Sequence, residues 1–339
     1  MVDTAVISAG SYEDVAPDRP GALMPSHAPH VLVVGEALVD EVRRADGTTA
    51  EHPGGSPANV ALTLGRLGRD VRLAAHLGRD ERGEQIRTWL ADSGVALTPG
   101  SDGAAATSVA RAVLDGSGAA TYDFAITWDL APGTAATGST LAVHTGSIAA
   151  VLEPGASAVH DLVLAARERS TITYDPNARP SLMGTPEAAL ARIEPLVAAA
   201  DVVKVSDEDV EWLYPGAEPV EVARTWARAP GAEQGPAIVV VTLGGEGAVA
   251  VCAAGEVRVE APRVDVVDTV GAGDTFMGAL IDGLWERDLL GGDRRDALRS
   301  VDLDVLTAVL ERCVAAAAIT VSRAGANPPR RAELPNTHA

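Results

Sequence analysis

The sequence is short of cysteine, of aromatic residues and of positive charge. Two cysteines, Cys252 and Cys313, are too few for a disulfide framework or a four-ligand zinc site; we expect both to be buried apolar residues in a reducing compartment. Aromatic residues make up only 3% of the 339 residues, so the core must be built from alanine, valine and leucine. With 27 basic against 47 acidic residues, the net charge of −20 argues against nucleic acid or an anionic membrane as the main partner.

Long hydrophobic runs are also missing. No stretch approaches the roughly 18 consecutive apolar residues that a membrane span requires, and the N-terminal segment lacks the basic start and apolar run of a secretory signal peptide. We therefore expect a cytoplasmic protein. Residues 1–29, scattered with Gly, Pro, Ser and Asp, are expected to form a flexible leader, and residues 330–339 a flexible tail.

Between these ends, residues 30–329 alternate short β-branched runs with longer segments of helical period. The strand-like runs are 31–34, 171–175, 202–205 and 238–242, and the helical segments begin near Ser56 and cover about 84–93, 273–290 and 303–322. Ser56 followed by Pro57 is typical of a helix N-cap and first turn, and this helix is expected to end at Gly68. The alternation predicts one α/β domain with a parallel sheet covered by helices.

Two segments, approximately 40–52 and 105–127, interrupt this alternation. They show period-2 patterning around the turns Asp46-Gly47 and Asp115-Gly116. Because both follow strands of the main sheet, we predict that they form a small β lid, which phosphoryl transfer needs to exclude water. The alternative is a pair of ordinary surface hairpins. A lid with apolar residues on both faces would expose them unless a partner covered them, so we also predict a homodimer through the lid.

The most informative motif is Asp268-Thr-Val-Gly-Ala-Gly-Asp274, which follows a valine-rich run and opens an amphipathic helix. The segment Gly271-Ala272-Gly273 is placed at a helix N-terminus, where free N–H groups and the helix dipole create an anion site. Asp274 in the first turn suits a base for proton abstraction coupled to phosphoryl transfer; the alternative is a helix cap. The segment lacks the third glycine of a dinucleotide fingerprint, and the chain has no P-loop motif.

A second motif, His52-Pro-Gly-Gly-Ser-Pro-Ala-Asn59, places a glycine pair before a helix. Gly54 and Gly55 allow the backbone to approach a ligand closely, and Asn59 offers an amide donor and acceptor. Asp40, after the first strand, could accept two hydroxyl groups. Carboxylate, amide and backbone together suit a polyol; the alternative is a tight turn with a capping residue.

Two further strands deliver polar residues and glycines at their carboxyl ends, where ligands bind in open parallel sheets. Thr242, Gly244 and Gly247 would admit phosphates or a purine ring, or would form a hairpin turn without a ligand. In the segment Lys204-Val-Ser206-Asp-Glu-Asp209, the lysine and serine would contact a phosphate and the acids would order magnesium-bound water. The alternative for this second segment is a capped surface helix.

In this order, the motifs resemble the ribokinase (PfkB) family of carbohydrate kinases over roughly residues 31–329. The glycine pair with Asn59, together with 78–83, resembles the first family signature, and 268–278 resembles the second. Within the family the chain is most similar to bacterial fructokinases, through Gly35-Glu36 and the segment Asp175-Pro-Asn-x-Arg179. The resemblance implies a ribokinase-like three-layer αβα sandwich with a mostly parallel central sheet and a small β-sheet lid.

The resemblance also implies a function: transfer of the γ-phosphoryl group of ATP to a primary hydroxyl of a small sugar, most of all fructose, with Mg²⁺ and K⁺ as ions. Asp274 would be the base, and the amides of Gly271, Ala272 and Gly273 the anion hole. The remaining implied contacts are Asp40, Gly54, Gly55, Asn59 and Arg179 to the sugar; Lys204, Ser206, Thr242, Gly244, Gly247 and Asn327 to ATP; Asp209, through water, to Mg²⁺; and Asp268 to the monovalent cation.

The sequence departs from the family at Ser206-Asp-Glu-Asp209, where the family usually has Asn-x-x-Glu; the shorter Asp209 puts the magnesium-water role in question. Arg179 suits a ring hydroxyl or the carboxylate of 2-keto-3-deoxygluconate, whose kinases also resemble this chain; the alternative is a surface salt bridge. From another class, a non-catalytic sugar or nucleotide sensor would use the same fold. A nucleotide-dependent oxidoreductase is disfavoured because the full glycine fingerprint is absent.

Overall fold

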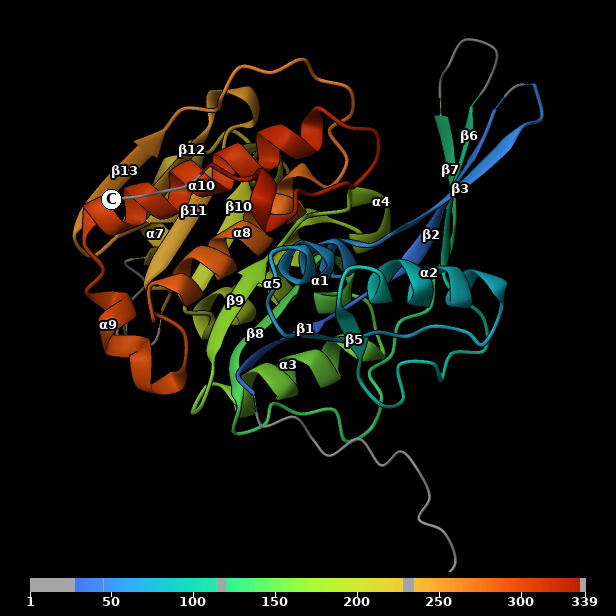
Figure 1. The fold of residues 1–339 in the computed structure, drawn as a ribbon, viewed down its shortest axis with the longest axis horizontal. Helices are drawn as coiled ribbons and strands as arrows, with labels where there is room; N and C mark the ends of the chain where they lie inside the picture. The colour runs from blue at the N-terminus through green and yellow to red at the C-terminus, as the bar shows by residue number, and fades with distance from the viewer. Residues whose placement is uncertain (1–27, 45, 115–119, 228–234, 336–339) are drawn as a thin grey trace, which may run out of the picture.

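The computed structural model describes residues 28–44, 46–114, 120–227 and 235–335 (Figure 1). Most of the expected leader (residues 1–27), the Asp115-Gly116 turn and the last four residues lie outside the described residues. Within the described ranges, no helix combines the length and apolar character needed to cross a bilayer.

The main sheet has nine strands in the order β13-β12-β11-β10-β9-β8-β1-β4-β5. Every neighbouring pair from β11 to β5 is parallel, whereas β12 is antiparallel to β11 and β13 to β12. The strands are β1 (His30–Val34), β4 (Val71–Ala74), β5 (Val95–Leu97), β8 (Thr140–Gly146), β9 (Thr171–Asp175), β10 (Val202–Ser206), β11 (Ile238–Thr242), β12 (Ala248–Cys252) and β13 (Gly255–Val259). The mostly parallel sheet is confirmed, with all four predicted strands in it.

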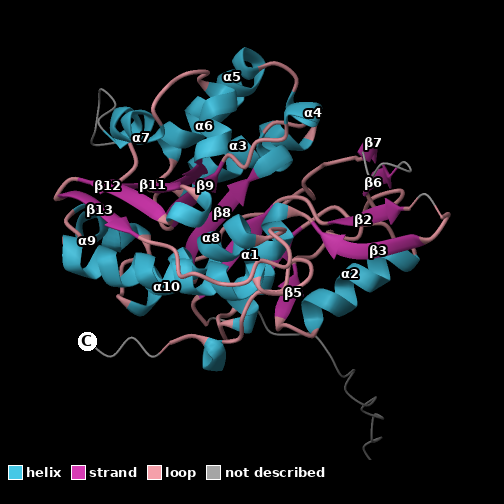
Figure 2. Cartoon of the chain, turned by 90° about the horizontal axis from the view of Figure 1, so that it is seen from above, coloured by secondary structure: helices cyan, strands magenta, loops and turns pink. Residues whose placement is uncertain are grey.

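Helices cover both faces of this sheet, as Figure 2 shows. Because alternate strand residues point to opposite faces, Val31 and Val33 join one core cluster and Leu32 and Val34 the other. The first core is closed by α1 (Ser56–Arg66), α2 (Glu81–Ala91), α8 (Ala272–Glu286), α9 (Arg295–Arg299) and α10 (Leu303–Val321), and the second by α3 (Gly155–Ala166), α4 (Pro180–Met183), α5 (Pro186–Ala199), α6 (Asp207–Leu213) and α7 (Pro219–Ala227). The three-layer sandwich is confirmed, and Cys252 and Cys313 are buried in the first core.

The four predicted helices are present as α1, α2, α8 and α10, with three local differences: the start of α2, the end of α8 at Glu286 instead of near residue 290, and the cap of α1. The second helix starts three residues earlier than predicted because Asp80 caps it, accepting from the Gly83 amide at 2.8 Å. The expectation that Ser56 caps α1 is wrong. Gly55 occupies the N-cap position with φ 104°, and Ser56 lies inside the helix, where its hydroxyl is free to bond elsewhere.

The two interrupting segments form a single four-stranded small sheet, which projects from the body in Figure 1. Its strands are β2 (Leu38–Arg43), β3 (Thr49–Gly54), β6 (Val109–Leu114) and β7 (Ala120–Ala125), in the order β3-β2-β6-β7. The central pair, β2 and β6, is parallel and joins the two segments. The alternative of two separate surface hairpins is therefore wrong.

The C-terminal segment is more ordered than the sequence predicted. Residues Arg331–Glu333 form a 3₁₀ turn, and the Arg331 Nε donates to the Leu67 carbonyl at 2.6 Å. Leu334 is buried in the first core. The expectation of a flexible tail from residue 330 is therefore wrong for residues 330–334, because long-range contacts that sequence patterning does not reveal hold this segment against the body.

Candidate active site

The predicted site residues lie at the carboxyl end of the parallel strands and at the start of α8. Asp175, Ser206 and Thr242 are the last residues of the neighbouring strands β9, β10 and β11. Such strand ends form the ligand-binding edge of open α/β sheets.

Asp274, in the first turn of α8, is held by three neutral donors from distant segments. Its Oδ1 accepts from the Ser56 hydroxyl at 2.7 Å and from the Asn177 amide at 3.3 Å, and its Oδ2 accepts from the Asn59 amide at 2.8 Å. The carboxylate is 7% exposed. Since its side-chain partners lie outside α8, the alternative of a simple helix cap is wrong.

The glycines before Asp274 are required by close approaches. Gly271 is the N-cap residue in the left-handed region at φ 75°, and a Cβ there would lie 2.7 Å from the Ala326 side chain. A Cβ on Gly273 would lie 2.9 Å from the Lys204 ammonium. The Ala272 amide donates to the Thr269 carbonyl at 3.2 Å, whereas the Gly273 amide finds no acceptor among the described residues. Of the three predicted anion-hole amides, those of Gly271 and Gly273 have no acceptor among the described residues and are free for a ligand, whereas that of Ala272 already has a partner.

Lys204 on β10 is fully buried and donates to the Asp175 Oδ2 at 2.9 Å. Burial raises the pKa of Asp175 to about 6, against the opposing effect of Lys204. Burial alone would lower the pKa of Lys204, but the carboxylates of Asp175 and Asp209 outweigh it and raise that pKa. Both groups are therefore charged at pH 7, and the pair lies directly beneath the first turn of α8.

Asp40 and the glycine pair meet where the small sheet joins the body. A Cβ on Gly54 would lie 2.3 Å from the Asp40 Oδ2, and a Cβ on Gly55 would lie 2.6 Å from the Glu36 carbonyl. Burial raises the pKa of Asp40 to about 6, and the charges of Arg179 and His52 oppose this. Glycine is therefore needed at Gly55, where the neighbour is backbone, whereas a side chain at Gly54 would displace the Asp40 carboxylate, which lies against the segment that leads into α1.

Arg179 is exposed and folds back on its own loop, where its Nη1 donates to the Asn177 side chain at 2.8 Å and to the Ala178 carbonyl at 2.9 Å. Among the described residues its guanidinium bonds only to this loop and not to a carboxylate, so the surface salt bridge alternative is wrong. Burial raises the pKa of Glu36 to about 7, and Arg179 is among the groups that oppose this rise. Since Arg179 acts electrostatically on both Asp40 and Glu36, it faces the same region of the site.

The glycine turn after β11 is a hairpin between β11 and β12. Gly244 and Gly247 have φ values of 52° and 100°, and a Cβ on Gly247 would lie 2.0 Å from the Val259 carbonyl. The Thr242 hydroxyl lies 3.5 Å from the Val205 carbonyl. A Cβ on Gly244 would meet nothing within 4 Å, so the backbone at this position is open to a ligand.

The loops 268–271 and 324–327 lie side by side at the start of α8. Asp268 joins them, because its Oδ1 accepts from the Val270 amide at 3.0 Å and its Oδ2 from the Gly325 amide at 2.9 Å. The Asn327 side chain instead accepts from the Arg66 guanidinium at 2.6 Å, which ties this loop to α1. Asp268 thus braces the loops with both carboxylate oxygens.

Ser206 and Asp209 form a capping box at the start of α6. The Ser206 hydroxyl accepts from the Asp209 amide at 3.0 Å, and the Asp209 Oδ2 accepts from the Ser206 amide at 3.1 Å. The Asp209 Oδ1 accepts from the Ala178 amide at 2.8 Å. Both carboxylate oxygens are therefore used by the fold, as the capped-helix alternative predicted. Nor do any three described His, Cys, Asp or Glu side chains gather as a metal site, so these residues do not fit a direct magnesium cage.

Sequence reasoning missed two of the three partners of Asp274. Ser56 was interpreted as a helix cap, and its position one residue inside the helix is what turns its hydroxyl toward Asp274. Asn177 has φ 37°, a left-handed conformation that asparagine tolerates better than most residues. The Asp-Pro-Asn sequence directly after a strand was the available signal for Asn177.

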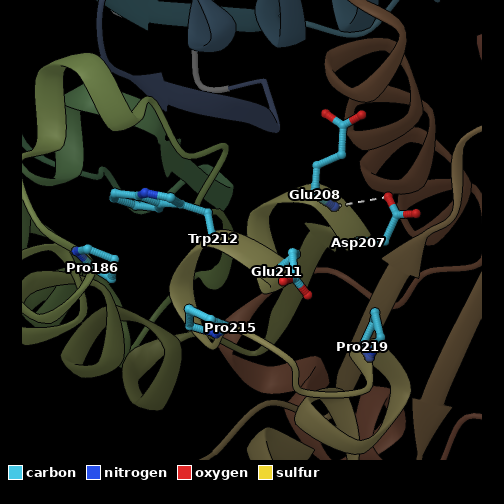
Figure 3. A pocket seen from close by; sticks show the side chains of 7 residues that line it. All are labelled: Pro186, Asp207, Glu208, Glu211, Trp212, Pro215 and Pro219. Atoms are coloured by element: carbon cyan, nitrogen blue, oxygen red, sulfur yellow. Dashed lines mark hydrogen bonds between the residues drawn. The ribbon is translucent and has the colours of Figure 1, made fainter.

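An open depression of about 750 Å³ lies elsewhere, along α6 (Figure 3). It is lined by Pro186, Asp207, Glu208, Glu211, Trp212, Pro215 and Pro219. Two of its lining residues, Asp207 and Glu208, belong to the predicted Lys204–Asp209 segment, but Asp274 and the residues that contact it do not line it. The residues that surround Asp274, rather than this depression, form the candidate active site.

Comparison with known proteins identifies relatives over most of the chain. A fructokinase from Rhizobium leguminosarum bv. trifolii is 33% identical over 276 residues, which are 77% of this chain and 81% of that protein. An aminoimidazole riboside kinase from Salmonella typhimurium is 30% identical over 262 residues, 74% of this chain and 79% of the relative. The crystal structure of a Xylella fastidiosa fructokinase with bound ATP has the same fold, with a TM-score of 0.74 at 24% identity, covering 90% of this chain and 95% of that one.

The sequence profile of the pfkB family carbohydrate kinases matches residues 28–332. The match spans both the glycine pair that precedes α1 and the Asp268–Asp274 segment that opens α8. It confirms the resemblance inferred from the motifs, including the expectation of an enzyme that transfers phosphoryl groups. The chain belongs to the pfkB family of carbohydrate kinases.

Proposed function

We propose that this enzyme is a fructokinase, which transfers the γ-phosphoryl group of ATP to a primary hydroxyl of fructose. The proposal rests on the set of three neutral donors, Ser56, Asn59 and Asn177, which we call the clamp on Asp274. They hold this buried carboxylate beside the glycine amides at the start of α8. The identity with a curated fructokinase supports the choice of sugar.

Asp274 acts as the base in this proposal. The pKa of a sugar hydroxyl lies far above 7, so Asp274 takes the proton as the hydroxyl oxygen attacks phosphorus rather than before it. The hydroxyl O–H bond and the bond from phosphorus to the ADP oxygen break while the new oxygen–phosphorus bond forms. The amides at the start of α8, foremost that of Gly273, stabilise the charge on the transferring group.

The sugar is proposed to lie between the small sheet and α1. Asn59 donates to Asp274 through its amide nitrogen, and its buried Oδ1 has no partner among the described residues, so this oxygen is available to a sugar hydroxyl. Asp40 would accept further hydroxyls, the backbone of Gly54 and Gly55 would approach the ring, and Arg179 would contact it from the opposite loop. The small sheet would act as the lid over the sugar.

ATP is proposed to lie along the carboxyl ends of β10 and β11 and the adjoining loops. Lys204 and Ser206 would face its phosphates, and Thr242, Gly244, Gly247 and Asn327 would contact the nucleotide. Four valines that are 41–64% exposed lie on the segment that leads to α8, an apolar surface suited to a purine ring: Val264, Val266, Val267 and Val270.

Mg²⁺ is proposed to enter as the ATP complex, since the carboxylate oxygens of Asp209 are already used by backbone amides. K⁺ is proposed to bind at backbone oxygens of the loops that Asp268 braces. Replacing KCl with NaCl in the assay tests this: turnover should fall, and equal turnover in both salts would contradict it.

We also propose a cytoplasmic homodimer that pairs through the small sheet, where Val113 is 44% exposed on β6. Light scattering at micromolar concentration should report twice the chain mass for the wild-type protein. A monomer under these conditions would contradict the dimer.

The substrate is tested by measuring ADP release from purified protein with ATP, Mg²⁺ and a sugar panel. We expect the highest kcat/KM with fructose. The panel includes aminoimidazole riboside, because of the riboside kinase relative, and 2-keto-3-deoxygluconate, because Arg179 offers an exposed cation for its carboxylate. A higher kcat/KM with either compound would replace fructose as the substrate, and tight sugar binding without any ADP release would favour a sensor.

A further inference from the structure

The buried ion pair Asp175–Lys204 lies against the proposed anion hole. Asp175 ends β9 and Lys204 lies on the neighbouring β10, and both side chains are almost completely buried. The ammonium group approaches α8 so closely that a Cβ on Gly273 would lie 2.9 Å from it.

The charges of three carboxylates act on the Lys204 ammonium: Asp175 from β9, Asp209 from α6 and Asp274 from α8. A fourth titratable group, His144 on β8, also feels its charge, but its pKa is lowered to about 3 by burial and by Lys204, so it is neutral. Asp209 is occupied by backbone amides, and Asp274 by neutral side-chain donors. Only Asp175 takes a hydrogen bond from Lys204.

This buried ion pair contributes little to the free energy of folding. Two charges lose their hydration on burial, and a well-packed apolar pair in their place is often neutral or stabilising. Moreover, the second carboxylate oxygen of Asp175, Oδ1, is buried without a partner among the described residues, which adds a further cost. An arrangement that costs stability at the catalytic edge of the sheet indicates a role in the reaction.

We propose that Asp175 is a positioning residue for phosphoryl transfer: it holds the Lys204 ammonium beneath the first turn of α8 and keeps it from pairing with Asp274. The ammonium then faces the transferring phosphoryl group, and the base keeps its capacity to accept the sugar proton. This inference rests on the proposed kinase activity at this site.

The test compares kcat, the KM for fructose and the melting temperature in wild type, Asp175→Asn, Lys204→Met and the double variant. Asp175→Asn leaves a buried ammonium without its counter-charge, so we expect a lower melting temperature and a kcat at least about tenfold lower, with the KM for fructose within about twofold of wild type. Removing Lys204 as well should restore the melting temperature. The kcat of the double variant should nevertheless stay as low as that of Lys204→Met, because Asp175 acts through Lys204.

A merely structural pair gives a different result: the double variant would then recover both its melting temperature and its kcat. That recovery would overturn the inference, as would a double variant much slower than Lys204→Met, since Asp175 would then act independently of Lys204. If the wild type released no ADP with any sugar, the proposed function would fail first; an active wild type with an equally active Asp175→Asn overturns this inference alone.

A matched control is available at the other end of β10. There Asp201 is buried and pairs with Arg295 at 2.6 Å, at the amino end of the strand and away from α8. Asp201→Asn should lower the melting temperature while kcat stays within about twofold of wild type. A comparable loss of kcat in this control would show that breaking any buried pair slows the enzyme, and would overturn the assignment to Asp175.

Discussion

Two aspartates on the same helix show how partners decide what a carboxylate does. Asp274 and Asp282 lie two turns apart on α8, both are buried, and each accepts from three side chains. The partners of Asp274 are a hydroxyl and two amides, which are neutral. The partners of Asp282 are the guanidinium groups of Arg69, Arg312 and Arg331.

The neutral partners orient the Asp274 carboxylate, whereas the cationic partners neutralise the charge of the Asp282 carboxylate. Neutral donors fix the direction of a carboxylate and leave its negative charge in place, which a base needs. Three cations compensate the charge and join the segments that carry them; here they tie α8 to the end of α1, to α10 and to the C-terminal turn. One helix thus carries the proposed base at its start and a structural carboxylate in its second half.

The largest effect is expected from Asp274→Asn. The substituted amide keeps the size of the side chain but cannot take the sugar proton, so kcat should fall by roughly 10²–10⁴-fold. The melting temperature should fall only modestly, because the substituted NH2 group meets a donor that now bonds Asp274, while Lys204 keeps its hydrogen bond to Asp175. ADP release and thermal unfolding measure the two effects; a kcat near that of wild type would show that Asp274 is not the base.

Asp282→Asn should have the opposite profile. It leaves three guanidinium groups without their shared counter-charge, so the free energy of unfolding should drop by about 3–5 kcal/mol. At a temperature where the variant is folded, kcat should stay within about twofold of wild type. Denaturant titration gives the stability; an unchanged unfolding midpoint would contradict the structural role of this carboxylate.

Ser56→Ala removes one neutral donor from the clamp on Asp274. Hydrogen bonds to charged groups contribute about 1.5–3 kcal/mol, so we expect kcat to fall about tenfold if the hydroxyl orients the base. The matched control is Ser170→Ala, which removes a buried hydroxyl that donates to the Thr140 carbonyl at 2.8 Å, away from the site. Equal kcat values in the two variants would show that the Ser56 hydroxyl does not orient the proposed base.

Asp40 offers a smaller, pH-dependent effect. Burial raises the pKa of Asp40 to about 6 from the usual 3.8, so this carboxylate becomes protonated between pH 7 and pH 5. The protonated group accepts sugar hydroxyls less well, and the KM for fructose should therefore rise about fivefold over this range. Because folding raises this pKa, protonation of Asp40 stabilises the fold as the pH falls through this window, and unfolding through this group cannot explain the change. Asp40→Asn should flatten the profile and the exposed Asp46→Asn should not; an unchanged wild-type KM would contradict the role of Asp40.

Local periodicity accounts for what the sequence could predict. The β-branched runs and helical segments of the main sandwich, and the two segments of the small sheet, each carry their signal within a few residues. The glycines before Asp274 likewise mark the start of α8 directly.

What the sequence could not predict are contacts between distant segments. Ser56 and Asn177 reach Asp274 across 218 and 97 residues of chain, and no local pattern distinguishes a capping serine from one that turns toward a carboxylate. The ordering of the C-terminal turn could not be predicted for the same reason, because Arg331 pairs with the distant Asp282 on α8.

The glycine pair also connects the small sheet directly to Ser56, one of the donors to Asp274. Strand β3 ends at Gly54 and α1 begins at Ser56, so one residue separates the edge strand of the small sheet from the hydroxyl that donates to Asp274. A side chain at Gly54 would contact the Asp40 carboxylate, and one at Gly55 would collide with the Glu36 backbone. The connection between β3 and α1 is therefore close-packed and made of glycine. We therefore expect a displacement of β3 to move Ser56 and to change the orientation of the Asp274 carboxylate, so that the position of the small sheet would set the geometry of the proposed base.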